Sequence, residues 1–195
     1  MVAVYVILAY LLGSIPVGVV LSKLKGQDPR KAGSGNIGAT NVMRTVGKGL
    51  GILTLVGDIV KGFLPAWFCI HYDQPAIIVA ACGLAAFAGH VWPIYLGFRG
   101  GKGVATALGL FLALKPSVIP ILLVVFVFVL LKWRYVSLGS LAGTALTPIL
   151  LVLFGSPVEY VIGSLIVALL IYYKHRDNIK RLLAGTEHKF RATPA

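Results

Sequence analysis

Residues 48–70 read KGLGILTLVGDIVKGFLPAWFCI, and beyond Lys48 this apolar run contains only two charged residues, Asp58 and Lys61. About 20 apolar residues in a helix cross the hydrocarbon core of a bilayer, so the run predicts a transmembrane helix. Asp58 and Lys61 are three residues apart and share one helix face. We expect them to point into a helix bundle and to pair, because an unpaired charge in hydrocarbon is costly. Such a pair fits a structural role and a role in a functional site equally well.

The rest of the chain has the same apolar character. Of its 195 residues, 58% are hydrophobic and 12% are charged, and the mean hydropathy is +0.91. A soluble domain of this length carries about twice that charged fraction. We therefore expect an all-α integral membrane protein in which residues 1–195 form a single polytopic domain. Cys69 and Cys82 lie in apolar stretches and are interpreted as packing residues. Residues 1–21 lack the basic start and the cleavage site of a signal peptide, so they are interpreted as a retained helix.

The apolar runs predict seven transmembrane helices. They lie at about 2–22, 48–70, 75–96, 102–114, 117–132, 136–154 and 157–173. The fourth run is short for a span, so it must be shielded by neighbouring helices or extended by the glycines that precede it. Alternatively, the third and fourth runs form one broken hairpin.

The basic residues predict the orientation of these helices. With seven spans, 16 of the 18 Lys and Arg residues fall on one side of the membrane, all except Lys61 and Lys115. The positive-inside rule makes that side cytoplasmic, which places the N-terminus outside and the C-terminus inside. The net charge of +12 then requires no nucleic-acid partner, because it sets the topology and attracts anionic lipids and substrates. We expect the active site in the cytoplasmic segments 23–47, 97–103 and 132–136 and in an amphipathic tail, 174–195.

The first cytoplasmic segment contains the stretch Gly33-Ser34-Gly35-Asn36-Ile37-Gly38-Ala39-Thr40-Asn41, followed by Arg44. Closely spaced glycines allow a positive φ and expose successive N–H groups. The hydroxyl and amide side chains add neutral donors, and an arginine can fork onto an oxyanion. The stretch contains no acid. This combination predicts a phosphate site. The alternative is a flexible loop between two helices, for which Gly, Ser and Asn are ordinary residues.

The next cytoplasmic segment follows Gly89-His90-Val91-Trp92-Pro93 and includes Gly100-Gly101-Lys102-Gly103, just before a predicted helix. Free N–H groups at a helix start, together with an ammonium, form an anion site. The spacing does not match a P-loop, because Leu96 stands where a glycine is required. The alternative is that the glycines allow close helix packing. That alternative does not explain the neighbouring cations Arg99 and Lys102. His90 is either a base or a residue hydrogen-bonded to a neighbouring helix.

The third cytoplasmic segment leads into the sixth predicted helix. Ser137 and Ser140 stand at the start of that helix, where either could cap it or point at a ligand.

The tail reads KHRDNIKRLLAGTEHK over residues 174–189, which predicts a short amphipathic helix ending at Gly185. A basic anchor on anionic lipid accounts for its cations. It gives no reason for Asn178 and Glu187.

Together, the motif regions 33–44, 89–106 and 174–189 resemble the bacterial membrane glycerol-3-phosphate acyltransferase family that uses acyl phosphate. The resemblance covers nearly the whole chain, including its length and number of spans. It implies that acyl phosphate and sn-glycerol 3-phosphate give 1-acyl-glycerol 3-phosphate (lysophosphatidic acid) and inorganic phosphate, the first acylation of phospholipid synthesis, at the inner membrane. The implied partners are the two substrates and membrane lipids. No cofactor, metal or obligate protein partner is expected.

The resemblance and the chemistry of the residues together assign roles. The Gly33–Asn41 loop and the Gly100–Gly103 backbone are expected to hold the phosphates. Candidates for glycerol 3-phosphate are Arg44, Lys102, His175 and Asn178, and Glu187 is expected to orient a hydroxyl or a basic residue. Catalytic roles are expected for Ser34, Asn36, Arg44, Lys102, Asn178 and Glu187. Substrate contacts are expected from Gly33, Gly35, Gly38, Thr40, Asn41, His90, Gly100, Gly101, Gly103, Ser137, Ser140, His175 and Arg176.

The chain lacks the His and Asp separated by four residues that many glycerolipid acyltransferases use as a base, since none of its four His has that partner. An acyl phosphate is already activated. We therefore expect a phosphate oxygen of the substrate to accept the hydroxyl proton, while the protein positions the reactants and stabilises charge. An alanine at His90 alone that lowered kcat several thousandfold with the fold intact would instead identify His90 as the base.

A membrane transporter of an organic phosphate is the main alternative, because glycine-broken helices and basic groups also suit that function. Against it, the basic residues gather at one face and no inverted repeat is evident. A structural or lipid-binding membrane protein is a third possibility.

Overall fold

The computed structural model describes residues 2–190, and within them every regular element is a helix. The chain divides into two compact units, Met1–Leu114 and Lys115–Ala195. Arg191, one of the basic residues counted in the tail, lies outside the described residues, as does the rest of the 174–195 segment beyond Phe190.

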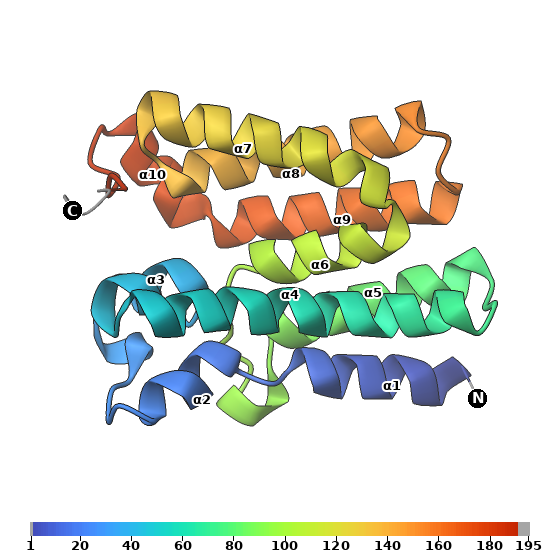
Figure 1. Cartoon of the computed structure of the whole chain (residues 1–195), viewed down its shortest axis with the longest axis horizontal. Coiled ribbons are helices and arrows are strands. Elements are labelled where there is room, and N and C mark those ends of the chain that lie inside the picture. Colours follow the sequence, from blue (N-terminus) through green and yellow to red (C-terminus); the bar gives the residue numbers. More distant parts are fainter. Residues whose placement is uncertain (1, 191–195) are drawn as a thin grey trace. The chain divides into compact units, whose positions relative to one another are not determined.

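The first unit is built around one long helix, α4, which packs against α2, α3, α5 and α6 (Figure 1). The helix α1 packs mainly against α5. The elements of this unit are α1 (Val2–Gly13), α2 (Val17–Lys23), η1 (Pro29–Lys31), α3 (Ala39–Thr45), α4 (Lys48–His71), α5 (Ala76–Val91), η2 (Ile94–Leu96) and α6 (Val104–Leu114). The segment between the first two predicted spans is therefore not one irregular loop, because it contains η1 and α3.

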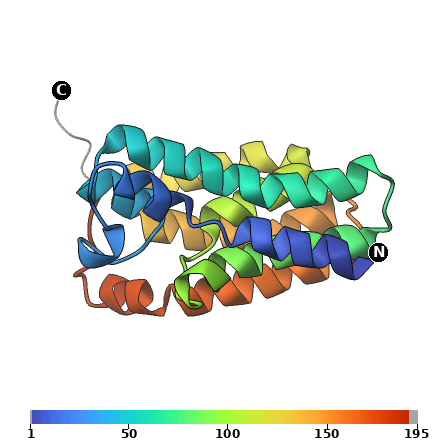
Figure 2. The same ribbon diagram turned by 90° about the horizontal axis from the view of Figure 1, so that it is seen from below.

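The first predicted span, 2–22, is not one continuous helix. It breaks between α1 and α2, and Figure 2 shows the chain leaving helical form there. Pro16 stands at the break, and a proline removes one N–H donor and clashes with the preceding turn. The ammonium of Lys61 donates to the carbonyl of Ile15 over 2.8 Å. The same carbonyl also accepts from the Val17 N–H over 3.0 Å, so a side chain from α4 adds a second hydrogen bond at the break.

The short helix α6 lies very close to α4. A Cβ added at Gly62 would collide with the carbonyl of Thr106, and one added at Gly109 would collide with the carbonyl of Ile59. Small residues permit such close backbone approach between helices in membranes. Neighbouring helices therefore shield this short span, as the sequence required, and α6 packs mainly on α4 rather than forming a hairpin with α5.

The second unit contains η3 (Pro116–Val118), α7 (Ile119–Trp133), α8 (Val136–Leu153), α9 (Val158–Lys174) and α10 (Arg176–Leu183). Helix α8 packs against both α7 and α9. The chain bends by 60° between α9 and α10. Gly185 follows α10 with φ +70°, and the N–H of Thr186 reaches back to the carbonyl of Arg181 over 2.8 Å. This confirms the predicted helix end at Gly185.

Five helical segments among the described residues are long and apolar enough to cross a membrane, or six if the bent pair α9–α10 counts as one. The chain is thus an all-helical integral membrane protein. Helix α6 has 11 residues and falls below that length, so a seventh crossing stays a prediction.

Candidate active site

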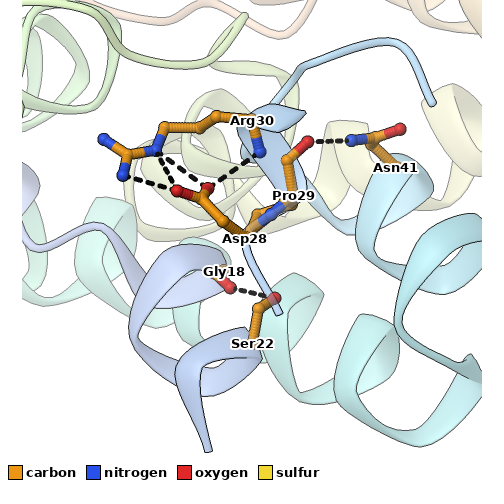
Figure 3. Close-up of polar contacts among 6 residues, drawn as sticks. All are labelled: Gly18, Ser22, Asp28, Pro29, Arg30 and Asn41. Atoms are coloured by element: carbon orange, nitrogen blue, oxygen red, sulfur yellow. Dashed lines mark hydrogen bonds and ion pairs between the residues drawn. The ribbon is translucent and has the colours of Figure 1, made fainter. Parts of the chain in front are cut away.

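The glycine-rich stretch of the first unit is folded around the side chain of Asn41, which is 2% exposed. Its Oδ1 accepts a hydrogen bond from the Ser34 N–H over 2.9 Å. Its Nδ2 donates to three backbone carbonyls, those of Pro29 at 2.8 Å, Ala32 at 3.1 Å and Asn36 at 2.8 Å. Figure 3 shows the bond to Pro29. Asn41 therefore shapes the loop, and its expected contact with substrate stays a prediction.

The loop uses up several of its own N–H groups. Gly33 and Gly35 have φ of +60° and +70°, as the glycine spacing predicted. However, the N–H of Ser34 bonds Asn41, that of Gly35 bonds the Ala32 carbonyl, and that of Gly38 bonds the Asn36 side chain. The expectation that successive N–H groups point outward is wrong for these three, because each satisfies an acceptor within the loop.

Side chains are further donors that this loop can offer to a phosphate. The exposed ones are Ser34, Thr40 and Arg44, and Asn36 is half-buried. Thr40 and Arg44 belong to α3, while Ser34 stands between the two positive-φ glycines. Ser34 and Asn36 precede α3, Thr40 lies in its first turn and Arg44 lies in its last turn. The loop is also seated firmly, because a Cβ at Gly18 of α2 would collide with the Ile37 carbonyl.

A hollow of about 240 Å³ lies beside this loop and is lined by Gln27, Asp28, Ala32, Thr45 and Val46. Its only charged lining residue, Asp28, forms an ion pair with Arg30 at 2.7 Å (Figure 3). The hydrogen bond from the Arg30 side chain is the main cause that lowers the pKa of Asp28 to about 2. A carboxylate that stays ionised repels a phosphate, so this hollow does not suit an anion.

The second motif lies at the start of α6. Lys102 is half-buried between Gly101 and Gly103, which are both buried, and Gly103 has φ +84°. The N–H of Gly101 donates to the His90 carbonyl over 3.1 Å, so it is not available to a ligand. The N–H groups in the first turn of α6 have no acceptor within the helix. Lys102 thus stands two residues before α6, and a cation together with a helix N-terminus is a combination that attracts anions.

Thr106 belongs to that same first turn of α6. It is 0% exposed, and among the described residues its hydroxyl has no hydrogen-bond partner. A buried hydroxyl of this kind is uncommon in folded proteins. It adds a further polar group to the first turn of α6.

The predicted pair of Asp58 and Lys61 is confirmed, at 2.9 Å between Oδ1 and Nζ. The same carboxylate oxygen lies 3.5 Å from Nδ1 of His90. His90, predicted to be a base or a residue bonded to a neighbouring helix, thus faces α4 with one ring nitrogen. The chain has no His and Asp separated by four residues. Here, however, a histidine of α5 and an aspartate of α4 lie close together.

In the second unit, Glu187 ties the tail to α8 and α10. Its Oε1 accepts hydrogen bonds from Ser137 Oγ at 2.9 Å and from Asn178 Nδ2 at 2.6 Å. Its Oε2 accepts from Arg181 Nε at 2.7 Å. Burial raises the pKa of Glu187, but the hydrogen bonds from these three partners outweigh burial and leave the pKa below its ordinary value. The carboxylate is therefore ionised at neutral pH, and its hydrogen bonds hold the segment after α10 against α8 and α10.

The remaining candidates of this unit have local partners. Ser140 donates to the Val136 carbonyl over 2.9 Å, and neither serine caps α8, whose N-cap is Tyr135. The capping interpretation was therefore wrong, because the helix begins before both serines. His175 is buried, with Nδ1 at 2.8 Å from the Ile171 carbonyl. Arg176 is exposed and lies over the Tyr173 ring at 4.9 Å.

Comparisons with known proteins bear on this arrangement. The sequence pattern described as glycerol-3-phosphate acyltransferase matches residues 3–185. The chain belongs to the glycerol-3-phosphate acyltransferase family. A curated relative of that name from Geotalea daltonii is 52% identical over 188 residues, which covers 96% of this chain and 97% of the relative. Another, from Aquifex aeolicus, is 46% identical over 186 residues, with 95% and 97% covered.

Two solved structures of PlsY, described as an integral membrane glycerol 3-phosphate acyltransferase, share the fold of this family member. The glycerol 3-phosphate form has a TM-score of 0.95 and 45% identity, covering 97% of this chain and 96% of that chain. The lysophosphatidic acid form has a TM-score of 0.92 and 44% identity, covering 97% and 95%. The resemblance that the motifs suggested is thereby confirmed.

Two contacts of this family member were not specified by the sequence. One is the ion pair between Arg181 and Glu187 across the turn at Gly185, and the other is the approach of His90 to Asp58. For the first, the sequence indicated only that Glu187 would orient a hydroxyl or a basic residue, because a carboxylate among cations needs a partner. Sequence spacing gave no signal for the second, because it joins two helices.

We expect Glu187→Gln to lower the free energy of unfolding of this family member by about 1 kcal/mol, or roughly 2–4 °C in Tm, since Arg181 is partly exposed. The depressed pKa sets the pH dependence. The carboxylate contributes its full stability above its ordinary pKa of 4.5 and loses it as the pH falls through the lower folded value.

Thermal unfolding at pH 7 and at pH 4 or below checks this expectation. The difference between wild type and Glu187→Gln should shrink at the lower pH. Asp177→Asn, which removes an exposed acid of α10, is the matched control and should change Tm little at either pH. If the Tm difference between wild type and Glu187→Gln were the same at both pH values, the ionised carboxylate would not be what stabilises the tail.

Proposed function

We propose that this chain transfers an acyl group from acyl phosphate to the 1-hydroxyl of sn-glycerol 3-phosphate. The hydroxyl oxygen bonds to the acyl carbonyl carbon, and the bond from that carbon to the phosphate oxygen breaks. The products are 1-acyl-glycerol 3-phosphate and inorganic phosphate. The PlsY structures support this proposal, because they are described as a glycerol 3-phosphate form and a lysophosphatidic acid form, which correspond to the acceptor and the product.

The position of Lys102 carries the proposal within this chain. It lies half-buried between two buried glycines, directly ahead of the first turn of α6. Both substrates are phosphates. This segment combines an ammonium with first-turn N–H groups that have no acceptor within the helix, and the motif contains no acid. The side chains of Ser34, Asn36, Thr40 and Arg44 supply a second set of donors in the same unit.

The proton of the attacking hydroxyl passes to a phosphate oxygen of the substrate. The donor's phosphate is a good leaving group, so the protein's task is to hold two anions in register and to stabilise the charge that develops on the carbonyl oxygen. In the second unit, Asn178 and Glu187 hold each other at 2.6 Å, which fixes the polar face of α10.

The reaction takes place at the cytoplasmic face of the inner membrane. The basic residues support this orientation, since 16 of the 18 Lys and Arg residues share one side when seven spans are drawn. The segments 23–47, 97–103 and 132–136 and the tail from residue 174 then lie on that face. The short helix α6 supplies the seventh crossing within the shield of α4.

The orientation predicts the outcome of cysteine labelling in cells. In a background with Cys69 and Cys82 replaced by Ala, a cysteine at Tyr72 should react with a membrane-impermeant thiol reagent added outside. A cysteine at Ala32 should react only after the membrane is permeabilised. Both positions are exposed, so accessibility does not limit either reaction. The opposite pattern would reverse the orientation and place the site outside.

Purified protein in detergent, incubated with acyl phosphate and glycerol 3-phosphate, tests the activity. Release of inorganic phosphate should depend on glycerol 3-phosphate and should match the lysophosphatidic acid formed. The rival function, transport of an organic phosphate, predicts no release in detergent and uptake only in sealed vesicles. The broken first span is the observation that favours this rival, because transporters often bind substrate at broken helices.

A further inference from the structure

A buried charged network beneath the Gly100–Gly101 turn takes no part in the mechanism above. We propose that Asp58 and Lys61 are positioning residues that hold His90 in the orientation which shapes this turn for the substrate phosphate. The inference rests on the proposed function, because the phosphate-binding role of Lys102, which follows this turn, is taken from there.

His90 connects α4 to the Gly100–Gly101 turn. Asp58 Oδ1 lies 2.9 Å from Lys61 Nζ and 3.5 Å from His90 Nδ1. His90 accepts the Gly101 N–H through its carbonyl over 3.1 Å. A Cβ added at Gly101 would collide with Nε2 of the same histidine. One residue therefore lies near the carboxylate with one ring nitrogen, accepts a hydrogen bond from the turn with its carbonyl, and packs its other ring nitrogen against Gly101.

The network is held from both sides. Asp58, Lys61 and His90 are 2%, 3% and 4% exposed, so water does not compete for their contacts. Lys61 also donates to the carbonyl of Ile15, at the break in the first span. Tied at both ends, the ammonium holds the carboxylate where it faces the imidazole. A proton on Nδ1 pointing at the carboxylate leaves Nε2 as an acceptor on the side of Gly101.

This geometry favours positioning over proton transfer by His90. A general base must come within about 3 Å of the hydroxyl whose proton it removes. Gly101 lies against Nε2, with no space between them for a single added carbon atom. Gly100 is packed in the same way, since a Cβ there would collide with the His90 carbonyl. The turn thus takes its shape from His90, and His90 takes its orientation from Asp58.

Asp58→Asn tests the proposal, because it keeps the side-chain shape and removes the charge. We expect the KM for one phosphate substrate, and the inhibition constant of inorganic phosphate, to rise about tenfold, with kcat at saturation within about threefold of wild type. Loss of stability alone would lower the active fraction and leave KM unchanged. Thr54→Val is the matched control, because Thr54 is 0% exposed on the same helix and its hydroxyl bonds the Leu50 carbonyl of its own helix.

A second variant, Asp58→Asn combined with Lys61→Met, separates positioning from stability. Removing both charges avoids a lone buried ammonium, so Tm should recover relative to Asp58→Asn. The raised KM should persist, because His90 still lacks its carboxylate. The double variant also supplies the kinetic test if Asp58→Asn does not fold.

A wild-type KM in both variants, or a KM that recovers together with Tm, would overturn the proposal and leave a purely structural pair. Failure of both variants to fold would overturn it as well, since the pair would then serve folding itself. A wild-type protein that releases no phosphate with glycerol 3-phosphate would instead refute the proposed function, which keeps the two failures distinct.

Discussion

Asn41→Asp should lower acyl transfer at least about a hundredfold and reduce the yield of folded protein, because it reverses the polarity of a buried network. The amide nitrogen of Asn41 donates to three backbone carbonyls within 3.1 Å. A carboxylate has the same size but places an oxygen where that nitrogen donates. Each lost hydrogen bond costs about 1 kcal/mol, and a buried carbonyl left without a donor costs more. The loop that presents Ser34 and Asn36 would lose its shape.

The measurements are phosphate release at saturating substrate and thermal unfolding in detergent. Thr45→Val is the matched control. Thr45 lies on the same helix, its hydroxyl bonds only the Asn41 carbonyl at 2.8 Å, and valine keeps the methyl group that faces Gly33. Near wild-type activity in the control is expected. If Asn41→Asp kept wild-type turnover, the loop would not need this scaffold and its link to the site would fail.

The second large effect is expected at Lys102. Alanine removes one charge-assisted hydrogen bond to phosphate, worth roughly 1.5–3 kcal/mol, or about one to two decades in rate or affinity. Arginine keeps the charge, but its planar guanidinium is larger than an ammonium and needs a different geometry. The position leaves little room, since both flanking glycines are buried and a Cβ at Gly103 would collide with Phe87. Both substitutions should lose most activity.

Thermal unfolding should stay within a few degrees of wild type for both Lys102 variants, which separates a site defect from misfolding. Arg99→Lys provides the control, because Arg99 is an exposed cation of the same segment and the swap keeps its charge. It should leave turnover unchanged. A Lys102→Arg protein with wild-type turnover would show that Lys102 only snorkels to the interface, and would move the phosphate site to Arg44 and the first loop.

The sequence predicted the features that depend on local composition. The apolar runs predicted the helices within a few residues, because hydrocarbon admits little except helix. The spacing of Asp58 and Lys61 predicted their ion pair, since both lie on one face of one helix. Gly185 predicted the end of α10, because only a residue that accepts positive φ closes a helix in that way.

Predictions failed where a residue had a choice of partners. Ser34, Gly35 and Gly38 were expected to point their N–H groups outward, yet each found an acceptor inside the loop. The expectation that Ser137 caps a helix was wrong, because the N-cap of α8 is Tyr135, and the Ser137 hydroxyl bonds Glu187, fifty residues along the chain. The first run was predicted to be one helix although it contains Pro16, at which it breaks. Hydropathy averages over a window and does not detect the loss of a single hydrogen bond.

By itself, the sequence determined that this chain is a helical membrane protein, that its cations gather in a few short segments, and that these segments carry groups suited to phosphate. Those properties follow from residue type and spacing within one helix or one loop. Only the tertiary structure decided that Asp58 faces His90, that Asn41 is the centre of the first loop, and that α6 lies within backbone contact of α4. The first and the third join segments far apart in the chain, and the second gathers carbonyls from up to twelve residues away within one loop. Packing against a particular neighbour, rather than any local preference, selects which polar groups meet.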